Sequence, residues 1–344
     1  MPSFLIERPR ASGAGSEREA WLGSAILERP LVSVIVPAYG VAELLGEALS
    51  SLRAQRWQHW EAIVVDDGAP DDVAGAFEPF AEDPRFRLLR TDNGGLATAR
   101  NRGVAASQAP YIALLDGDDI YEPDYLERMV GLMEADFRLG FVSCDATMFG
   151  ARPWAGHRYS ERYPLSGPVT LDRVLSREVQ IVVSAMIRRS ALDQVGGFDG
   201  SLRSVEDLDL WIRLLAAGWG GAIVQKPLVR YRRRPGSLST DDRGMLTAAC
   251  AVYRKACNAL ADRPEGVTAA RTLARYEQLL RYLDGQDAIL KGDIEGGLRL
   301  LDGMEQRSPR WRLAMPIMRR VPWLAAPMLR MRSVTPRPRS WLLG

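Results

Sequence analysis

Four short apolar runs, regularly spaced over the first third of the chain, constrain its fold most strongly. They are LVSVIVP, EAIVVD, FRLLR and YIALLD, at 31–37, 61–66, 86–90 and 111–116. Runs of this length that are rich in Val and Ile are typical of buried strands. Stretches with helical spacing of apolar or small residues separate them. This alternation predicts an α/β fold, a mostly parallel sheet with helices on both faces.

A cluster of polar residues and glycines follows each of these runs. The clusters are PAYG, DDGAPDD, TDNGG and DGDD, at 37–40, 66–72, 91–95 and 116–119. In open parallel sheets, ligands bind in the crevice beyond the carboxyl ends of the strands. We therefore expect the four clusters to share one edge of the sheet and to form the functional site there.

Three aspartates in the last cluster, Asp116, Asp118 and Asp119, lie close enough for their charges to repel one another. A divalent cation would relieve this repulsion, because Mg²⁺ typically takes one or two protein carboxylates together with water and phosphate oxygens. Turn formation, with capping of a helix that begins near Pro123, explains the same residues. Taken alone, these residues leave both explanations open.

The pattern is less regular after residue 140. A strand leading into a short helix, then a helix, then a strand ending in a basic turn are expected at 179–192, 206–218 and 222–237. From about residue 241 the chain shows helical patterns without strand signals. The expected regions are a tail or arm, an α/β domain and a helical region, at 1–30, 31–240 and 241–344.

Five segments resemble, in this order, the motifs of glycosyltransferase family 2: LVSVIVPAYG, EAIVVDDGAPDD, NGGLATARNRG, YIALLDGDDIYEPDYL and GGFDGSLRSVEDLDLWIRL. The resemblance covers about residues 31–240. It implies a GT-A fold, which is Rossmann-like, and an inverting enzyme that depends on a nucleotide-sugar. The implied reaction moves a sugar from a nucleotide-sugar to a hydroxyl of a glycan or lipid-linked acceptor. A UDP-sugar is the expected donor. Polysaccharide, cell-envelope glycan or glycoconjugate synthesis is the implied context.

The resemblance also implies where the nucleotide binds. Three residues would line the nucleobase pocket: Pro37, Ala38 and Tyr39. Asp67 would accept a hydrogen bond from the base. Alternatively, Asp67 caps the helix after Pro70. Asp66 or Asp71 could provide this cap equally well.

The remaining motifs imply contacts to the rest of the donor. Four residues would close over the nucleotide and ribose: Gly94, Gly95, Arg100 and Asn101. A plain turn is the alternative for the two glycines. Asp116 and Asp118 would bind the donor through a metal ion, Mg²⁺ or Mn²⁺, that also binds its diphosphate. Asp118 would be the direct ligand of this metal. Asp119 would support the metal ligands from behind or cap the helix that follows.

An inverting transfer needs a carboxylate that takes the proton of the acceptor hydroxyl, and the resemblance places this base at Asp207. Leu208 and Trp211 would anchor the following helix, which leaves Asp207 at the helix start, where the dipole favours an ionised carboxylate. Capping by Glu206 and Asp207 is the alternative. Asp209 is expected at the surface or in an acceptor loop.

Two positions depart from the family pattern. Gly40 stands where many members have Asn, and Arg234 stands where relatives often have a His that helps to hold metal or diphosphate. An Arg cannot coordinate a metal, but its guanidinium binds phosphate oxygens in a forked geometry. Arg232, Arg233 and Arg234 are therefore expected to help neutralise the leaving UDP, and the full ligand set of the metal stays open.

The formal net charge of +2 hides an uneven distribution. Residues 307–344 hold nine Arg and no Asp or Glu, so the first 306 residues carry −7. Arg interleaved with Trp311, Trp323 and Trp341 predicts an amphipathic segment at a membrane interface. A helix packed on the catalytic domain is the alternative, favoured because three prolines between 316 and 327 interrupt any long helix.

Other partners and the location follow from smaller signals. Nucleic acid is not an expected partner, because no recognised module accompanies the charge. Residues 241–305 are considered as a homodimer surface or a lid.

Three cysteines without ligand spacing are expected to be reduced and mostly buried: Cys144, Cys250 and Cys257. No signal-peptide pattern and no run of about 18 apolar residues occurs. A cytoplasmic location is expected, peripheral at the inner face of the plasma membrane if the basic end binds lipid.

Two other functions fit less well. A sugar-nucleotide pyrophosphorylase on a related sheet would need a Gly-rich N-terminal loop with a catalytic Arg or Lys, which VSVIVPAYG does not supply. A degenerate domain that only binds a nucleotide-sugar as a scaffold is suggested by Gly40 and Arg234. The presence of both Asp118 and Asp207 argues instead for catalysis.

Overall fold

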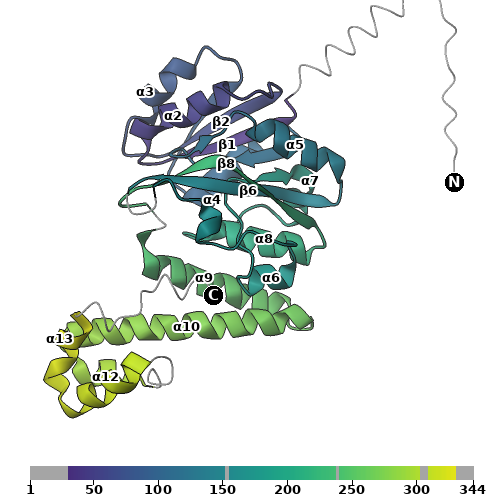
Figure 1. Cartoon of the computed structure of the whole chain (residues 1–344). Coiled ribbons are helices and arrows are strands. Elements are labelled where there is room, and N and C mark those ends of the chain that lie inside the picture. The colour runs from purple at the N-terminus through teal and green to yellow at the C-terminus, as the bar shows by residue number, and fades with distance from the viewer. Residues whose placement is uncertain (1–29, 152–154, 238–239, 303–308, 331–344) are drawn as a thin grey trace, which may run out of the picture.

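A single sheet forms the centre of the α/β part, with helices on both of its faces (Figure 1). The computed structural model describes residues 30–151, 155–237, 240–302 and 309–330. Within these residues, eight strands pair in the order β3-β2-β1-β4-β7-β6-β8-β5. This mixed sheet with a helical C-terminal region confirms the predicted fold class.

Four parallel strands form the N-terminal half of the sheet. They are β1 (Val32–Ala38), β2 (Trp60–Asp67), β3 (Phe86–Thr91) and β4 (Tyr111–Leu114). Between them lie α2 (Ala42–Arg53), α3 (Val73–Phe77) with the 3₁₀ turn η1 (Glu78–Phe80), and α4 (Leu96–Ala105). All four predicted strands are confirmed. The order 3-2-1-4 reverses beside β1, which is where open sheets of this kind bind ligands.

Alternation along the strands creates two cores, one on each face. Val32, Val34 and Val36 of β1 join the core on the α2 side, whereas Ile35 joins the core on the α4 side. In Figure 1, α2, α3 and α5 (Tyr125–Ala135) lie on one side of the sheet. On the other side lie α4, α6 (Leu171–Leu175) and α8 (Glu206–Ala216). Because β1 is apolar on both faces, it needs a helical layer on each.

The C-terminal half of the sheet mixes strand directions. β7 (Met186–Arg188), followed by α7 (Arg189–Gln194), runs antiparallel to β4 and to β6 (Leu139–Gly150). β8 (Gly220–Arg233) runs parallel to β6, and β5 (Ile120–Tyr121) closes the edge antiparallel to β8.

Two of these strands differ from the sequence pattern. β6 is buried along most of its length, and polar residues such as Ser143 and Asp145 interrupt its apolar run, so neither alternation nor a continuous apolar stretch reveals it. The strand expected from residue 179 begins only at Met186. Residues 179–185 are mostly buried but lie outside the ladder of the sheet.

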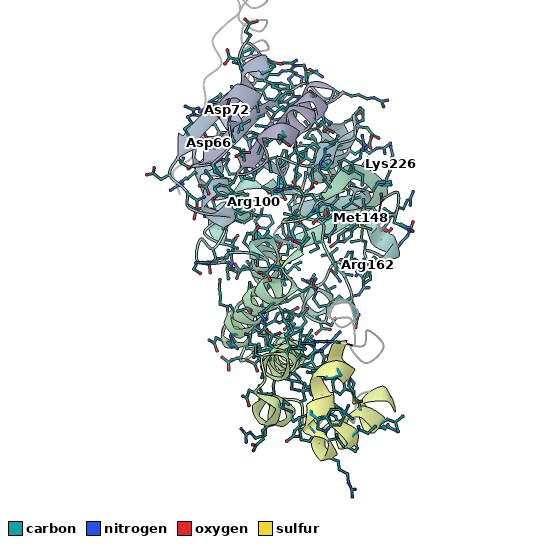
Figure 2. The ribbon with its side chains drawn as sticks, turned by 90° about the vertical axis from the view of Figure 1, so that its left-hand side faces the viewer. Asp66, Asp72, Arg100, Met148, Arg162 and Lys226 are labelled. Atoms are coloured by element: carbon teal, nitrogen blue, oxygen red, sulfur yellow. The ribbon has the colours of Figure 1, made fainter. Side chains whose placement is uncertain are left out.

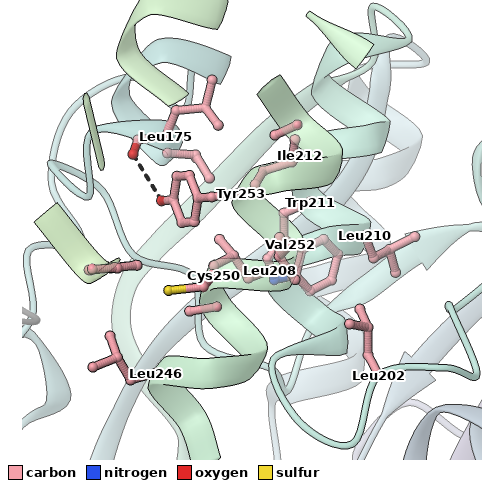
Figure 3. Close-up of a cluster of buried hydrophobic side chains, with 14 of the residues drawn as sticks. Leu175, Leu202, Leu208, Leu210, Trp211, Ile212, Leu246, Cys250, Val252 and Tyr253 are labelled. Atoms are coloured by element: carbon pink, nitrogen blue, oxygen red, sulfur yellow. Dashed lines mark hydrogen bonds between the residues drawn. The ribbon is translucent and has the colours of Figure 1, made fainter. Parts of the chain in front are cut away.

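Helix α9 (Asp242–Ala259) packs on α8 and extends the core on the α4 side of the sheet (Figure 3). Trp211 of α8 is 1% exposed and lies against Phe141, with ring centroids 4.7 Å apart. The Tyr253 hydroxyl of α9 donates a hydrogen bond to the carbonyl oxygen of Leu175 at 2.9 Å. These contacts join α6, α8 and α9 into one packed unit behind the sheet.

The remaining helices form a further layer, farther from the sheet (Figure 1). They are α10 (Pro264–Leu290), α11 (Ile294–Leu300), α12 (Pro309–Arg320), η5 (Pro322–Leu324) and α13 (Ala325–Arg330). Across the described residues, no helix has the length and apolarity needed to cross a bilayer.

Helix α12 packs on α10 and α11 rather than on the catalytic domain, so that expectation is wrong. The ring of Trp311 lies edge-on to Tyr282 of α10, with centroids 5.7 Å apart. Pro316 lies inside α12 without ending it. The carbonyl that loses its donor there belongs to Arg312, which is exposed, so water can replace the missing N–H. Trp341 lies outside the described residues.

Candidate functional site

Close backbone contacts bring together the loops that follow β1 to β4. A Cβ atom on Gly117 would lie 3.0 Å from the carbonyl oxygen of Pro37, so the loops after β1 and β4 touch. A Cβ atom on Gly68 would lie 2.7 Å from the backbone N of Asn93, so the loops after β2 and β3 touch as well. The position of Gly68, which also has a φ of 63°, therefore needs a residue without a side chain, and the space at Gly117 is tight.

Asp71 joins the loop after β2 to the loop after β1. Its carboxylate accepts hydrogen bonds from Gly40 N at 2.9 Å and from Ala42 N at 2.6 Å. The N-cap of α3 is Asp72, whose carboxylate accepts a hydrogen bond from Gly75 N at 2.9 Å, so the cap is none of the three aspartates expected to provide it. Gly40 has a φ of 65°, a left-handed conformation that Asn also tolerates.

The nucleobase residues lie at different depths. Tyr39 is 53% exposed at the rim, and its ring is open to a ligand. Pro37 and Ala38 are buried in β1, and Ala38 has no exposed surface. They lie beneath the loop, and Ala38 joins the core between the sheet and α2.

Asp67 organises the turn that begins α4. Its two carboxylate oxygens accept hydrogen bonds from Gly94 N at 2.9 Å and Gly95 N at 2.8 Å, and Arg102 Nη1 lies 3.1 Å from Oδ1. Gly95 has a φ of 82°, so this turn needs a residue without a side chain. Asp67 is 3% exposed, and the role expected for it toward a base stays a prediction.

Arg100 of α4 connects two acidic groups that are far apart in the sequence. Its Nη2 donates to Asp116 Oδ1 at 2.6 Å, and its Nη1 donates to the Glu206 carboxylate. Figure 2 shows Arg100 well inside the α/β part of the molecule. Burial acts to lower the pKa of Arg100, but the charges of Asp116 and Glu206 outweigh it and raise this pKa, so the guanidinium stays charged. Because Arg100 is wholly buried, it positions Asp116 instead of offering surface to a nucleotide.

The aspartates after β4 meet the basic turn after β8. Arg234 Nε donates to Asp118 Oδ2 at 2.8 Å, and Arg232 Nε donates to the carbonyl oxygen of Asp118 at 2.7 Å. The backbone N of Arg232 donates to Asp119 Oδ1 at 2.8 Å. The structure therefore brings Arg234 to the predicted metal ligand, although residues 118 and 234 are 116 positions apart.

The acidic cluster has the donor chemistry that Mg²⁺ or Mn²⁺ requires. Asp119 Oδ2 is buried and has no hydrogen-bond partner among the described residues. Burial, followed by the charges of Asp116 and Asp118, raises the pKa of Asp119 well above its usual value. In the described part of the chain, no three His, Cys, Asp or Glu side chains are grouped as a metal site. That Asp116 and Asp118 hold such an ion together with phosphate oxygens and water stays a prediction.

Asp207 begins α8 beside Glu206, and its Oδ1 accepts a hydrogen bond from Leu208 N at 2.8 Å. Burial raises the pKa of Asp207, and the charge of Arg100 opposes this only in part. The net effect on this pKa is thus upward, whereas the argument from the sequence expected the ionised form to be favoured. The charge of Asp116 also raises the pKa of Asp207, so these two carboxylates lie within electrostatic reach of each other. Asp207 further lines a cavity of ≈ 230 Å³.

The segment before α8 is held in a strained conformation. Val205 has a φ of 54°, which a β-branched residue rarely adopts. The Asn101 side chain exchanges two hydrogen bonds with the backbone of Phe198, at 2.8 and 2.9 Å. Asn101 thus anchors the loop that leads to the acidic pair, and this is a different contact from the expected one with ribose.

Two residues of α8 have roles that the sequence does not reveal. Glu206 is expected only as a cap, but it is the buried partner of Arg100. Asp209 is expected at the surface, but it is 3% exposed and pairs with Arg213 and Lys255, each at 2.7 Å. The i, i+4 spacing could have indicated the pair with Arg213, but no local spacing links α8 to Arg100 or Lys255, which lie in other helices.

Similarity to known proteins agrees with this geometry. Residues 33–196 match the family model described as glycosyl transferase family 2. A Bacillus subtilis (strain 168) protein named as the teichuronic acid biosynthesis glycosyltransferase TuaG is 27% identical over 230 residues, which cover 66% of this chain and 88% of that one.

Two solved structures share the fold. Staphylococcal TarS 1-349 (S. aureus), in complex with UDP-GlcNAc, has a TM-score of 0.60 at 17% identity and covers 87% of this chain and 90% of its own. The mannosyltransferase PcManGT from Pyrobaculum calidifontis, in complex with GDP-Man and Mn²⁺, has a TM-score of 0.53 at 22% identity and covers 89% and 88%. The fold is thus of the GT-A type. Residues 33–196 form a glycosyl transferase family 2 domain, as the match to that family's model shows.

Replacement of Asp207 by Asn is expected to stabilise the protein increasingly as the pH rises. Because burial raises the pKa of Asp207 above 3.8, the folded state keeps this proton to a higher pH than the unfolded state does. Native stability therefore falls as the pH rises from 3.8 through the raised pKa. Asn does not ionise and keeps the acceptor for Leu208 N. Urea unfolding of both proteins at about pH 4.5 and 7.5 measures the difference.

Asp136→Asn is the matched control. The hydrogen bond from Arg138 lowers the pKa of Asp136 to about 2, so this carboxylate is ionised in folded and unfolded chains over most of that pH range. Its stability difference from the native protein should stay nearly constant between the two pH values. A difference for Asp207→Asn that is equally constant, or that shrinks as the pH rises, would contradict the raised pKa of Asp207.

Proposed function

We propose that the chain transfers a sugar, with inversion, from a nucleotide-sugar to an acceptor hydroxyl in polysaccharide, cell-envelope glycan or glycoconjugate synthesis. A UDP-sugar is the donor that we favour. The observation that carries this proposal is the buried bridge from Asp116 through Arg100 to Glu206, which joins the loop after β4 to the helix that carries Asp207. TarS and PcManGT, which share the fold, were solved with UDP-GlcNAc and GDP-Man, and this supports a nucleotide-sugar as the donor.

In the proposed reaction, the acceptor oxygen attacks the anomeric carbon from the face opposite the diphosphate. A bond forms between that oxygen and the carbon, and the bond from the carbon to the diphosphate oxygen breaks. The proton of the hydroxyl passes to Asp207, which acts as the general base. Tyr39 would lie against the base of the nucleotide, and Arg234 would donate to phosphate oxygens, because its guanidinium keeps free N–H groups beside Asp118.

We assign Asp116 and Asp118 to a divalent ion, Mg²⁺ or Mn²⁺, that would neutralise charge on the leaving diphosphate when bound. The unpartnered oxygen of Asp119 and the raised pKa values of Asp118 and Asp119 support a missing positive charge there. The Mn²⁺ in the mannosyltransferase of like fold also supports a divalent ion.

Asp207→Asn is expected to lower kcat for transfer by roughly 10²- to 10⁴-fold, since this is the usual contribution of a general base. Purified protein would be assayed with UDP-, GDP- and dTDP-sugars and Mn²⁺, with release of the nucleoside diphosphate as the readout. The same panel, read by thermal shift, identifies the nucleotide that binds.

Asp209→Asn is the matched control, because it changes the same residue type on the same helix. Asp209 pairs with Arg213 and Lys255, away from Arg100, so this variant should lose stability but keep turnover well below its melting temperature. Equal and negligible turnover by native protein and both variants, with a nucleotide-sugar bound, would favour the scaffold function instead.

Chelation by EDTA is expected to abolish turnover, and Mn²⁺ or Mg²⁺ should restore it, because two carboxylates and a diphosphate concentrate negative charge in one place. Asp118→Asn should raise the metal concentration needed for half-maximal rate. Full turnover in EDTA would instead mean that Arg234 and Arg232 neutralise the diphosphate without a metal.

We also propose that α12 and η5 rest on an anionic membrane, where they would bring the enzyme to a lipid-linked acceptor. One face of α12 is buried through Trp311, Met315 and Met318. The opposite face exposes apolar side chains, with Leu313 at 73%, Ile317 at 44% and Trp323 of η5 at 71% exposure. Exposed arginines flank this strip, which is the charge complement of an anionic lipid surface: Arg312, Arg320 and Arg330. The location would then be cytoplasmic, at the inner face of the plasma membrane.

Native protein is expected to sediment with vesicles of anionic phospholipid. The double variant Leu313→Ser with Trp323→Ser should reduce the bound fraction several-fold, because each substitution removes apolar surface that would be buried in the membrane. Phe137→Ser is the control, because Phe137 is 79% exposed in the α/β part. Binding that the double variant leaves unchanged would refute the membrane role. A native homodimer that the double variant dissociates would assign the strip to a subunit contact.

A further inference from the structure

A cavity of ≈ 230 Å³ lies on the α9 side of Asp207, between the α/β part and the C-terminal helices. Asp207 forms part of its wall, and α9 and α10 supply Met245 and Tyr276. The cavity is thus next to the proposed base, but Arg100 and Asp116 are not among the residues that line it. A molecule bound here would approach Asp207 from a side that does not include the aspartates proposed for the diphosphate.

Two hydrogen-bond donors in this wall have no partner. The Nε of Arg177 and the Nε2 of Gln180 are buried and make no hydrogen bond with any described residue. The two side chains are themselves joined, since Arg177 Nη2 donates to Gln180 Oε1 at 2.8 Å. Within the described residues, Arg177 forms no direct ion pair with a carboxylate, although the charge of Asp207 lies near enough to act on it. Two adjacent donors without a partner, one of them cationic, favour an acceptor such as an oxyanion at this place.

The backbone at Arg177 is strained. Its φ of 66° is left-handed, which costs on the order of 1–2 kcal/mol for a residue with a side chain. The turn is fixed by hydrogen bonds on both sides, from Arg177 N to Val174 O at 3.2 Å and from Val179 N to Arg173 O at 3.1 Å. Strain of this kind persists where the surrounding structure over-determines it, commonly at ligand sites.

Aromatic rings form the other side of the cavity. Tyr159 and Tyr163 stack with centroids 4.3 Å apart, and Tyr231 lies edge-on to Tyr159 at 6.3 Å. Aromatic surface with a few placed polar groups is typical of a site for a small organic ligand. Arg233 and Asp242 also line the cavity, and both have partners within the chain.

We propose that this cavity binds the acceptor through an anionic group, a carboxylate or a phosphate carried by a sugar or polyol. Arg177 Nε and Gln180 Nε2 hold the oxyanion, the tyrosines pack on the ring or chain, and a neighbouring hydroxyl faces Asp207. This assignment rests on the proposed transferase function and specifies its acceptor class.

The test compares probes that differ only in charge, by titration calorimetry on the full chain with UDP and Mn²⁺ present. Methyl glucuronide is compared with methyl glucoside, and glycerol 1-phosphate with glycerol. At least one anion should bind about tenfold or more tightly than its neutral match, since charge-assisted hydrogen bonds are roughly twice as strong as neutral ones. The anion that shows the larger preference distinguishes a uronate from a phosphate acceptor.

Arg177→Gln should remove this preference, Arg177→Lys should keep part of it, and Gln180→Leu should reduce it. Arg281→Gln is the matched control, because Arg281 is exposed on α10 and outside the cavity. UDP binding by each sample shows that it is folded. Equal binding of charged and neutral probes, or a preference that survives Arg177→Gln and Gln180→Leu, overturns the inference. If UDP and all nucleotide-sugars fail to bind, the proposed function itself fails, whatever the anions do.

Discussion

The buried guanidinium of Arg100 holds the candidate site together. It comes from α4, and its two carboxylate partners come from the loop after β4 and from the start of α8. Removal of one partner from a buried pair typically costs about 3–5 kcal/mol, because the other charge stays in a region that water does not reach. The ends of the parallel strands and the helix with Asp207 are therefore fixed relative to each other by charge as well as by packing.

The site gathers several acidic side chains in surroundings that disfavour their charge. Burial and neighbouring carboxylates raise the pKa values of Asp118, Asp119, Glu206 and Asp207. Such an arrangement costs stability and is typical of functional sites, where a ligand completes the charge balance. The left-handed backbone of Val205 and Arg177 lies in the same region. Strain and unbalanced charge thus occur together next to Asp207, supported by the core of α8 and α9.

The C-terminal helices are part of this arrangement and not a separate attachment. Lys255 of α9 pairs with Asp209 of α8, and α9 and α10 complete the cavity beside Asp207. Beyond them, α12 buries one face against the helical layer and exposes an apolar face between arginines. The donor side of the proposed site therefore belongs to the sheet, whereas the proposed acceptor side depends on helices that lie outside the matched family segment.

The sequence by itself determined β1 to β4, their polar loops and Asp207 as a candidate, because strand patterning and loop chemistry are encoded in consecutive residues. It did not reveal β6, whose polar residues are buried in the middle of the sheet. Only the tertiary structure decided that Arg100 pairs with Glu206, that Arg234 pairs with Asp118 and that Asp209 is buried. It alone placed Arg177 and Gln180 beside Asp207. The physical reason is that these contacts join side chains from distant elements, and their energies depend on burial and distance, which no local spacing encodes.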